Sequence, residues 1–545
     1  MELLEWVENS KKTSRKKLIE MKYFDLCFVG TLCLLALIFS VLYVLMSKTV
    51  YFWDDSTYWD IGRMLADKPL NFGFIKDVYN SAGTSDYNYF VAVPVSLWMK
   101  IFGITRVSYI VAVFAFYLMP AYMFIYLIAK KMCHKPLFAC VITLLMLPSM
   151  WYITVIGFID VAGVVVALGC YYLYMTKVLN SRKYLKYILL GVMLAFIMII
   201  RRYFAFFTVS FVTVMIIETI LFSRKFKELF ITLLSLGFVL VVLFYPFFTN
   251  ILLKDYGALY SSYKYSFATD LKLITRYFGL VTILLILSGT VYIAVKNKEK
   301  RVFLVLGQLL ICAIMFVSTQ THGQQHLLLY VPGMTVMLIF IANSATKRKL
   351  ILLLCIISLV NTISPCINRK QPQNIQEIKA LSMFPTYSVK PKKRTDINSV
   401  LALKRTLDKK IPEGATCGVL ASSFVLNSSI LINVVPSLNM KENREDNYIV
   451  GLPEVDSRDY WRLNELYECD YILVATPAQT HLAPGEQTII TRAVESFKNK
   501  TDIAMAFSEI SDFDMKIGSI DIRLYKKISN ITETAKTEFE LKLYK

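Results

Sequence analysis

The chain has 545 residues, of which 56% are hydrophobic and only 18% are charged, and its mean hydropathy is +0.51. These values exclude an ordinary soluble domain and are typical of a polytopic membrane protein. The formal net charge of +20 does not indicate nucleic-acid binding, because the basic residues form short clusters between apolar runs and lack an interleaved aromatic stripe.

A series of apolar runs occupies the first two thirds of the chain. The first, 23–46, follows a lysine-rich stretch and is too long for the core of a cleavable signal peptide, so we expect a membrane anchor. The other runs lie near 106–128, 137–155, 161–177, 185–200, 203–222, 230–249, 274–295, 302–318, 327–345 and 350–364. Their lengths predict about eleven transmembrane helices.

The polar connectors predict the orientation. Every second connector is basic, namely 130–135, 181–186, 223–227, 296–301 and 347–349, whereas the opposite ones carry acidic and neutral polar residues. Cytoplasmic loops are enriched in Lys and Arg. We therefore expect the N-terminus in the cytoplasm and the C-terminal region outside it.

The connector at 48–104 is unusually long and aromatic, and the acidic pair Asp54 and Asp55 stands near its start. Two amphipathic segments, 57–66 and 89–102, are predicted to form helices in the plane of the membrane interface. This arrangement would hold a carboxylate at headgroup level, facing a lipid-borne substrate. The equally weighted alternative is that the pair only caps the first interfacial helix.

Other charged residues gather on the same outer side. Asp160 lies between two apolar runs, where an ionisable group is costly, so it is a functional candidate, with helix capping as the alternative. Arg201 and Arg202 lie at an outer boundary that the positive-inside rule disfavours. A pair of guanidiniums there suits a lipid phosphate. Snorkelling of both side chains is the alternative.

Two later stretches complete the polar side. The loop 250–278 mixes aromatic and cationic residues, among them Tyr263, Lys264 and Arg276, as sugar and phosphate sites do, although an interfacial aromatic belt has the same composition. The second stretch holds His322, Gln325 and His326 before an apolar run. We expect these side chains to hydrogen bond to sugar hydroxyls or phosphate, or else to cap the helix. Metal binding is disfavoured because no third ligand is near.

The chain changes character after residue 364. A linker rich in Lys and Pro, 388–394, leads into segments that predict a small α/β domain over 365–545. We expect helices at 400–410 and 486–499, and strands at 415–420, 471–475 and 520–526. This region has no Gly-rich phosphate loop, nucleophile elbow or metal cluster.

The segment WDDSTYWDIGRML at 53–65 resembles the PDE-x-x-Y pattern of the polyprenyl-phosphate-dependent GT-C glycosyltransferases, a superfamily that includes the protein O-mannosyltransferases and the lipid A aminoarabinose transferases. DYNYFVAVPVSLWMKIFG at 86–103 is similar to the second half of that family's first outer loop. Two departures stand out: Trp53 replaces the family's proline, and no lysine stands near Asp86 and Tyr87, where some members place one for the lipid phosphate.

The resemblance implies a polytopic α-helical, GT-C-like catalytic domain over 1–364, N-in and C-out, with the α/β domain as the family's extra soluble domain. It implies transfer of a sugar, with inversion, from a polyprenyl-phosphate donor to an unknown glycan, lipid or protein acceptor. The site would lie on the extracytoplasmic side of a bacterial plasma membrane. Neither nucleic acid nor a cofactor is implied; a divalent cation is compatible but not indicated.

The resemblance also implies roles for residues. Asp54 would be the general base, supported by Asp55, Asp160 and Tyr58. Charge on the leaving phosphate would be stabilised by Arg201 and Arg202 with Lys264 or Arg276. The remaining predicted substrate-binding residues are Tyr87, Tyr203, Tyr263, His322, Gln325 and His326. The rival function is a transporter or lipid-linked sugar flippase, which is disfavoured because the polar residues gather at one face and no internal repeat is visible.

Overall fold

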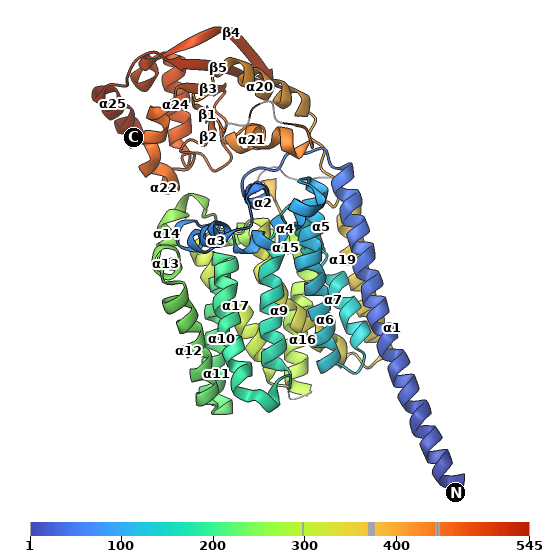
Figure 1. Cartoon of the computed structure of the whole chain (residues 1–545). Coiled ribbons are helices and arrows are strands. Elements are labelled where there is room, and N and C mark those ends of the chain that lie inside the picture. Colours follow the sequence, from blue (N-terminus) through green and yellow to red (C-terminus); the bar gives the residue numbers. More distant parts are fainter. Residues whose placement is uncertain (1, 297–298, 369–376, 442–443, 445–446, 544–545) are drawn as a thin grey trace.

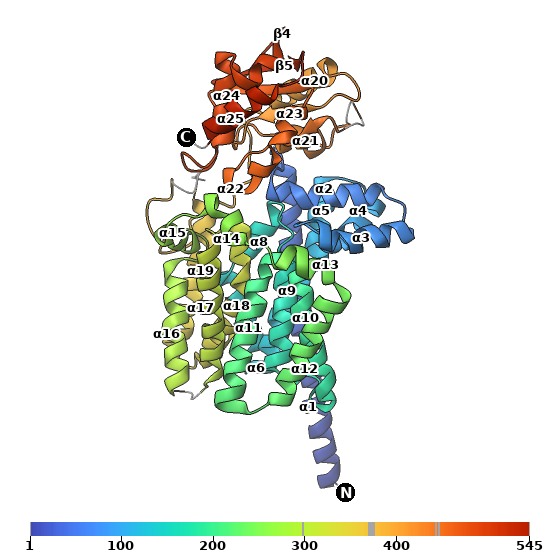
Figure 2. The ribbon, with the colours of Figure 1, turned by 90° about the vertical axis from the view of Figure 1, so that its left-hand side faces the viewer.

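The computed structural model describes residues 2–296, 299–368, 377–441, 444 and 447–543. A bundle of apolar helices carries a layer of short helices at one end, and an α/β domain lies over that layer (Figures 1 and 2). The bundle contains α1 (Glu2–Met46), α5 (Arg106–Val113), α6 (Met119–Met132), α7 (Pro136–Met146), α8 (Ser149–Val155), α9 (Val161–Met175), α10 (Lys183–Ile200), α11 (Ala205–Glu218), α12 (Phe226–Gly237), α16 (Leu280–Lys296), α17 (Arg301–Thr319), α18 (Val331–Ser344) and α19 (Arg348–Ile367).

Within the described residues, seven helices are long and apolar enough to cross a membrane, and nine if each of two bent pairs counts as one span. The chain is therefore an integral membrane protein, but the predicted count of eleven spans is not confirmed. Two of the predicted spans form α9 and α18, which have only 15 and 14 residues. Nearly every residue of α18 is buried, so protein surrounds this helix and lipid does not set its length.

Three predicted spans are not single continuous helices. Residues 137–155 form two helices, α7 and α8, bent by 57° around Pro148. The segment 274–295 is divided at Gly279, where α15 (Phe267–Phe278) meets α16 at 91°. The helix that starts with α12 ends at Leu243, before Pro246 begins the short α13 (Tyr245–Phe247). A proline cannot continue the backbone hydrogen bonds of a preceding helix, so these breaks have local causes at 148 and 246.

The layer at the end of the bundle consists mainly of the first long connector. It forms α2 (Asp54–Asp67), α3 (Phe72–Thr84), and a 3₁₀ turn, Phe90–Ala92, that continues into α4 (Val93–Phe102). The two predicted helices of this connector are present, their position in the membrane interface stays a prediction, and α3 was missed. This helix packs on α13, more than 150 residues away in the chain: a Cβ at Gly83 would lie 2.4 Å from Pro246 Cβ. A contact so distant in sequence leaves no local pattern.

The C-terminal region, which we call the outer domain, contains a five-stranded mixed sheet of order β2-β1-β3-β5-β4. Its strands are β1 (Cys417–Leu420), β2 (Ile449–Val450), β3 (Tyr471–Thr476), β4 (Phe507–Ile517) and β5 (Ile520–Lys527). Alternate residues of β3 face opposite sides. Leu473 packs with α20 (Ile397–Lys410) and α21 (Ser428–Ser437), while Ile472 packs with α24 (Thr488–Asn499) and α25 (Glu533–Leu543). The predicted α/β fold is confirmed.

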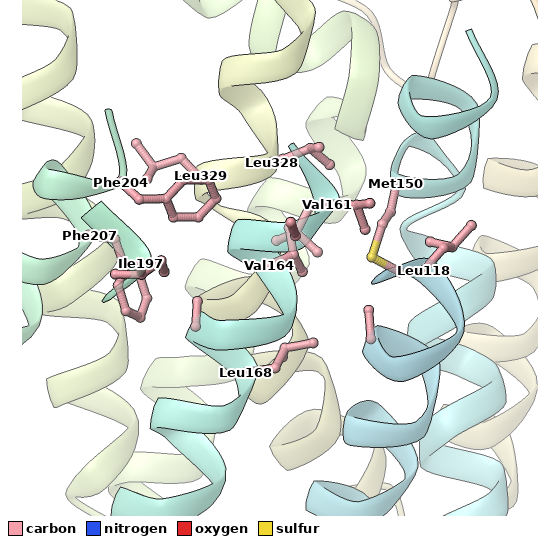
Figure 3. Close-up of a cluster of buried hydrophobic side chains, with 14 of the residues drawn as sticks. Leu118, Met150, Val161, Val164, Leu168, Ile197, Phe204, Phe207, Leu328 and Leu329 are labelled. Atoms are coloured by element: carbon pink, nitrogen blue, oxygen red, sulfur yellow. The ribbon is translucent and has the colours of Figure 1, made fainter. Parts of the chain in front are cut away.

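The centre of the bundle is apolar and closely packed around the first turns of α9 (Figure 3). Val161, Val164 and Leu168 lie within the buried hydrophobic core of the bundle. A Cβ at Gly163 would lie 2.3 Å from a ring carbon of Phe204, so only glycine permits this approach. The core therefore fixes the position of Asp160, which directly precedes α9.

The N-terminus and the outer domain lie at opposite ends of the bundle (Figure 1). We expect Ser511→Cys, at an exposed position of β4, to react with a membrane-impermeant maleimide in intact cells after the ten native cysteines are replaced. Ser181→Cys, exposed in a basic connector, should react only after cell lysis. The opposite pattern would reverse the orientation. Residues 297–298 of the connector 296–301 lie outside the described residues.

Candidate active site

The adjacent acids Asp54 and Asp55 serve different purposes. Asp55 Oδ1 accepts a hydrogen bond from the Phe52 backbone N–H at 3.0 Å, so its side chain reaches back to the segment that precedes α2. Asp54 has no such contact with the start of α2. The residue before the pair, Trp53, has φ 52° and ψ −128°, a conformation rare for non-glycine residues. This backbone turn separates the two carboxylates. Burial is the main cause that raises the pKa of Asp55 to about 7.

Both oxygens of Asp54 accept hydrogen bonds from distant segments. The Tyr87 hydroxyl donates to Oδ1 at 2.5 Å, and Gln325 Nε2 donates to Oδ2 at 2.6 Å. The absence of a side chain at Gly323 leaves room for the Gln325 side chain, because a Cβ at Gly323 would lie 2.7 Å from the Gln325 side-chain oxygen. The carboxylate is thereby held in one orientation by groups 33 and 271 residues away.

Asp160 and Arg201 form a buried ion pair, with 2.7 Å between Oδ1 and Nε. The Tyr203 hydroxyl also lies 2.7 Å from Asp160 Oδ1 and connects the pair to the Gln325 backbone carbonyl at 3.2 Å. The Arg201 guanidinium carbon lies 4.9 Å from the centroid of the Tyr58 ring and 5.4 Å from that of Tyr87. Because burial of an unpaired charge is costly, the pair and its tyrosines depend on one another.

Arg202 points into a second polar group. It pairs with Asp86 at 2.5 Å, donates to the Tyr260 hydroxyl, and lies 4.8 Å from the Tyr256 ring centroid. Lys254 Nζ also contacts Asp86, at 3.1 Å. Burial raises the pKa of Asp86, but Arg202 and Lys254 outweigh it and the pKa is lowered overall. Tyr260 and Lys254 belong to the predicted loop 250–278, whereas the sequence did not indicate Asp86 as a member of this group.

The two histidines differ in their surroundings. His322 Nδ1 lies 2.6 Å from Asp270 Oδ1 and its Nε2 lies 2.5 Å from the Tyr330 hydroxyl, so both ring nitrogens are engaged within the protein. His326 Nδ1 accepts a hydrogen bond from the Gly323 N–H at 2.9 Å, which places the proton of its neutral ring on Nε2. Burial, followed by nearby positive groups, lowers the pKa of His326 well below its usual value.

Two cavities meet at Asp54, and His322, Gly323, Gln325, Phe424 and His481 line both of them. The smaller, of about 400 Å³, is also lined by Tyr87, Arg201, Arg202, Tyr203, Tyr263 and His326, which were predicted to bind substrate. The larger, of about 820 Å³, is lined by Trp53, Asp55, Arg106, Arg276 and Lys392. We call these the arginine cavity and the linker cavity.

Three predicted site residues line neither cavity. Tyr58 is buried beneath Arg201, and Asp160 acts on the arginine cavity through Arg201 and Tyr203. Lys264 is exposed at its amino group, which donates to the Ser318 carbonyl at 2.8 Å. Its predicted role in phosphate binding stays a prediction. No cluster of three or more metal-ligating side chains occurs among the described residues.

The outer domain forms part of the cavity walls through Phe424, Arg458 and His481, none of which the sequence indicated. Arg458 donates to the Tyr263 hydroxyl at 3.2 Å. A line of hydrogen bonds, which we call the seam, joins α21 to the start of α2 (Figure 1). Its bonds are Tyr51 N to Ser437 Oγ at 3.3 Å, Trp53 N to Ser429 Oγ at 3.1 Å, Ser56 Oγ with Ser429 Oγ at 2.9 Å, and Asn433 Nδ2 to Asp60 Oδ2 at 3.0 Å.

Comparison with known proteins gives a likeness in structure alone. No protein-family model and no curated protein sequence matches the chain. ArnT from Cupriavidus metallidurans is similar in two crystal structures, at 10% sequence identity. The structure bound to undecaprenyl phosphate has a TM-score of 0.56 and the apo structure one of 0.58. Each match covers 91% of this chain, and 98% or 97% of the ArnT chain. The protein therefore has the fold of ArnT, which agrees with the polytopic helical architecture and the added α/β domain predicted from the sequence.

Proposed function

We propose that the protein is a membrane glycosyltransferase that moves a sugar from a polyprenyl-phosphate donor to an acceptor hydroxyl, with Asp54 as the general base. The observation that carries the proposal is that two adjoining cavities share Asp54. A transfer reaction needs a place for each of two substrates and a base between them.

The arginine cavity suits the donor. Arg201 and Arg202 line it, and guanidinium groups match the geometry of phosphate oxygens. The apolar side chains of Phe206 and Leu252 line the same space and can contact a prenyl chain. The likeness to ArnT, solved with undecaprenyl phosphate bound, supports this choice of donor. The linker cavity is then left for the acceptor.

The chemistry requires one proton transfer and one displacement. Asp54 takes the proton of the acceptor hydroxyl as its oxygen forms a bond to the anomeric carbon. The bond from that carbon to the phosphate oxygen breaks, and its electron pair leaves with polyprenyl phosphate. Attack from the face opposite the phosphate inverts the anomeric configuration. The positive charges of Arg201 and Arg202 stabilise the charge that builds up on the leaving group.

The purified protein, mixed with a panel of polyprenyl-phosphate sugars, is expected to release free polyprenyl phosphate only when an acceptor is also present. Product lipid can be measured by mass spectrometry, with the Asp54→Asn variant as the matched control. A flippase reconstituted in vesicles would instead move the lipid between leaflets with the sugar–phosphate bond intact. Translocation without bond cleavage, across the donor and acceptor panel, would contradict the proposal.

A further inference from the structure

An aromatic wall stands where the first loop meets the outer domain. The rings of Trp53 and His481 lie 4.2 Å apart between centroids, and Phe424 is 5.3 Å from Trp53 and 6.2 Å from His481. All three residues line the linker cavity. Phe424 is 38% exposed although it is large and apolar. A solvent-exposed apolar ring beside a cavity indicates a ligand-binding surface.

The wall also offers hydrogen-bonding groups. Trp53 Nε1–H is buried and has no hydrogen-bond partner among the residues that the structure describes, which is costly for a buried donor. His481 Nδ1 lies 2.9 Å from the Ser422 carbonyl, so its proton donates there and Nε2 carries the lone pair. Burial is the main cause that lowers the pKa of His481 to about 4, so the ring is neutral at pH 7 and Nε2 remains an acceptor.

These features match one class of ligand. A sugar ring has an apolar face of C–H groups that stacks on aromatic rings, and its hydroxyls both donate and accept hydrogen bonds. A lipid chain would leave the polar groups of Trp53 and His481 unsatisfied. An extended peptide would gain little from an isolated aromatic wall that offers no strand edge.

We propose that Trp53, Phe424 and His481 form a saccharide subsite for the acceptor, which is therefore a glycan held between the first loop and the outer domain. The inference rests on the proposed function, because it assigns the linker cavity to the acceptor. The position of Trp53 agrees with it: the residue directly precedes Asp54, and its unusual backbone conformation is held by the seam. A ring at this wall lies next to the general base.

The test is direct binding, without any donor. The full chain in lipid nanodiscs is titrated with an array of defined neutral and acidic oligosaccharides, with Ser- and Thr-containing tripeptides and phospholipid vesicles for comparison. We expect saturable binding of at least one oligosaccharide. Phe424→Ala and Trp53→Phe, which remove the open ring and the free N–H respectively, should each weaken binding by about tenfold.

The matched control is Trp461→Phe, at a tryptophan of the outer domain that is 80% exposed and lines neither cavity. Phe424→Tyr, which keeps the ring, should restore binding and so separates loss of the subsite from misfolding. Binding of peptides or vesicles only, binding of no oligosaccharide, or binding unaffected by the wall variants would each overturn the subsite, even if polyprenyl phosphate is released in the transfer assay. Conversely, if oligosaccharides bind with the expected variant effects but no donor is cleaved, the proposed function is contradicted and the saccharide subsite is still supported.

Discussion

Asp54→Asn is expected to reduce sugar transfer by a factor of about 10²–10⁴, the usual contribution of a general base. Asparagine keeps the size of the side chain and its acceptor oxygen for the Tyr87 hydroxyl, and the Gln325 amide can turn over to accept from the new NH₂ group. The variant should therefore fold and bind polyprenyl phosphate with nearly unchanged affinity. The measurement is the rate of polyprenyl phosphate release at saturating donor.

The neighbouring acid provides the control. Asp55→Asn preserves the oxygen that accepts from the Phe52 N–H, and the side chain stays at the end of the helix. We expect this variant to retain most of the activity. Full activity in Asp54→Asn together with loss in Asp55→Asn would exchange the roles of the two residues.

Arg201→Met is expected to have the largest effect on stability. It leaves the Asp160 carboxylate, 1% exposed in the native protein, without its ion-pair partner. Removal of one partner from a buried pair typically costs about 3–5 kcal/mol. The melting temperature of the purified protein should fall markedly, and donor binding and transfer should be lost as well.

The double variant Asp160→Asn with Arg201→Met separates structure from function. It removes both charges and keeps an acceptor for the Tyr203 hydroxyl, so much of the melting temperature should return. Transfer should stay low, because the guanidinium is still missing from the arginine cavity. Recovery of transfer along with stability would mean that Arg201 only balances Asp160 and does not act on the donor.

Local patterns predicted the architecture well because they follow from hydrophobicity. The apolar runs, the two amphipathic helices of the first loop and the alternating segments of the outer domain all have periodic signals. Pro148 and Pro246 indicate helix breaks in the sequence, but each lies within an apolar run long enough to be interpreted as one span. In contrast, α3 depends on its contact with α13, which no window of sequence around it contains.

The candidate site was predictable as a set of residue types but not as a geometry. Sequence alone left capping and catalysis evenly weighted for Asp54 and Asp55, because the choice depends on the backbone turn at Trp53. The contacts of Asp270 with His322 span 52 residues and depend on tertiary packing. The outer domain's Phe424 and His481 reach the cavities through tertiary contacts between distant segments, and neither stands in a recognisable motif.

The seam also determines how the protein can be altered by recombination. Three of its four bonds reach the turn or the first helical residues on either side of Asp54, and each uses a side chain of α21. A chimaera that exchanged the outer domain for another of similar shape would change the conformation of the turn unless serines stood at the positions of Ser429 and Ser437. The outer domain is thus not an interchangeable module, and substitutions in α21 and in residues 51–60 should be inherited together.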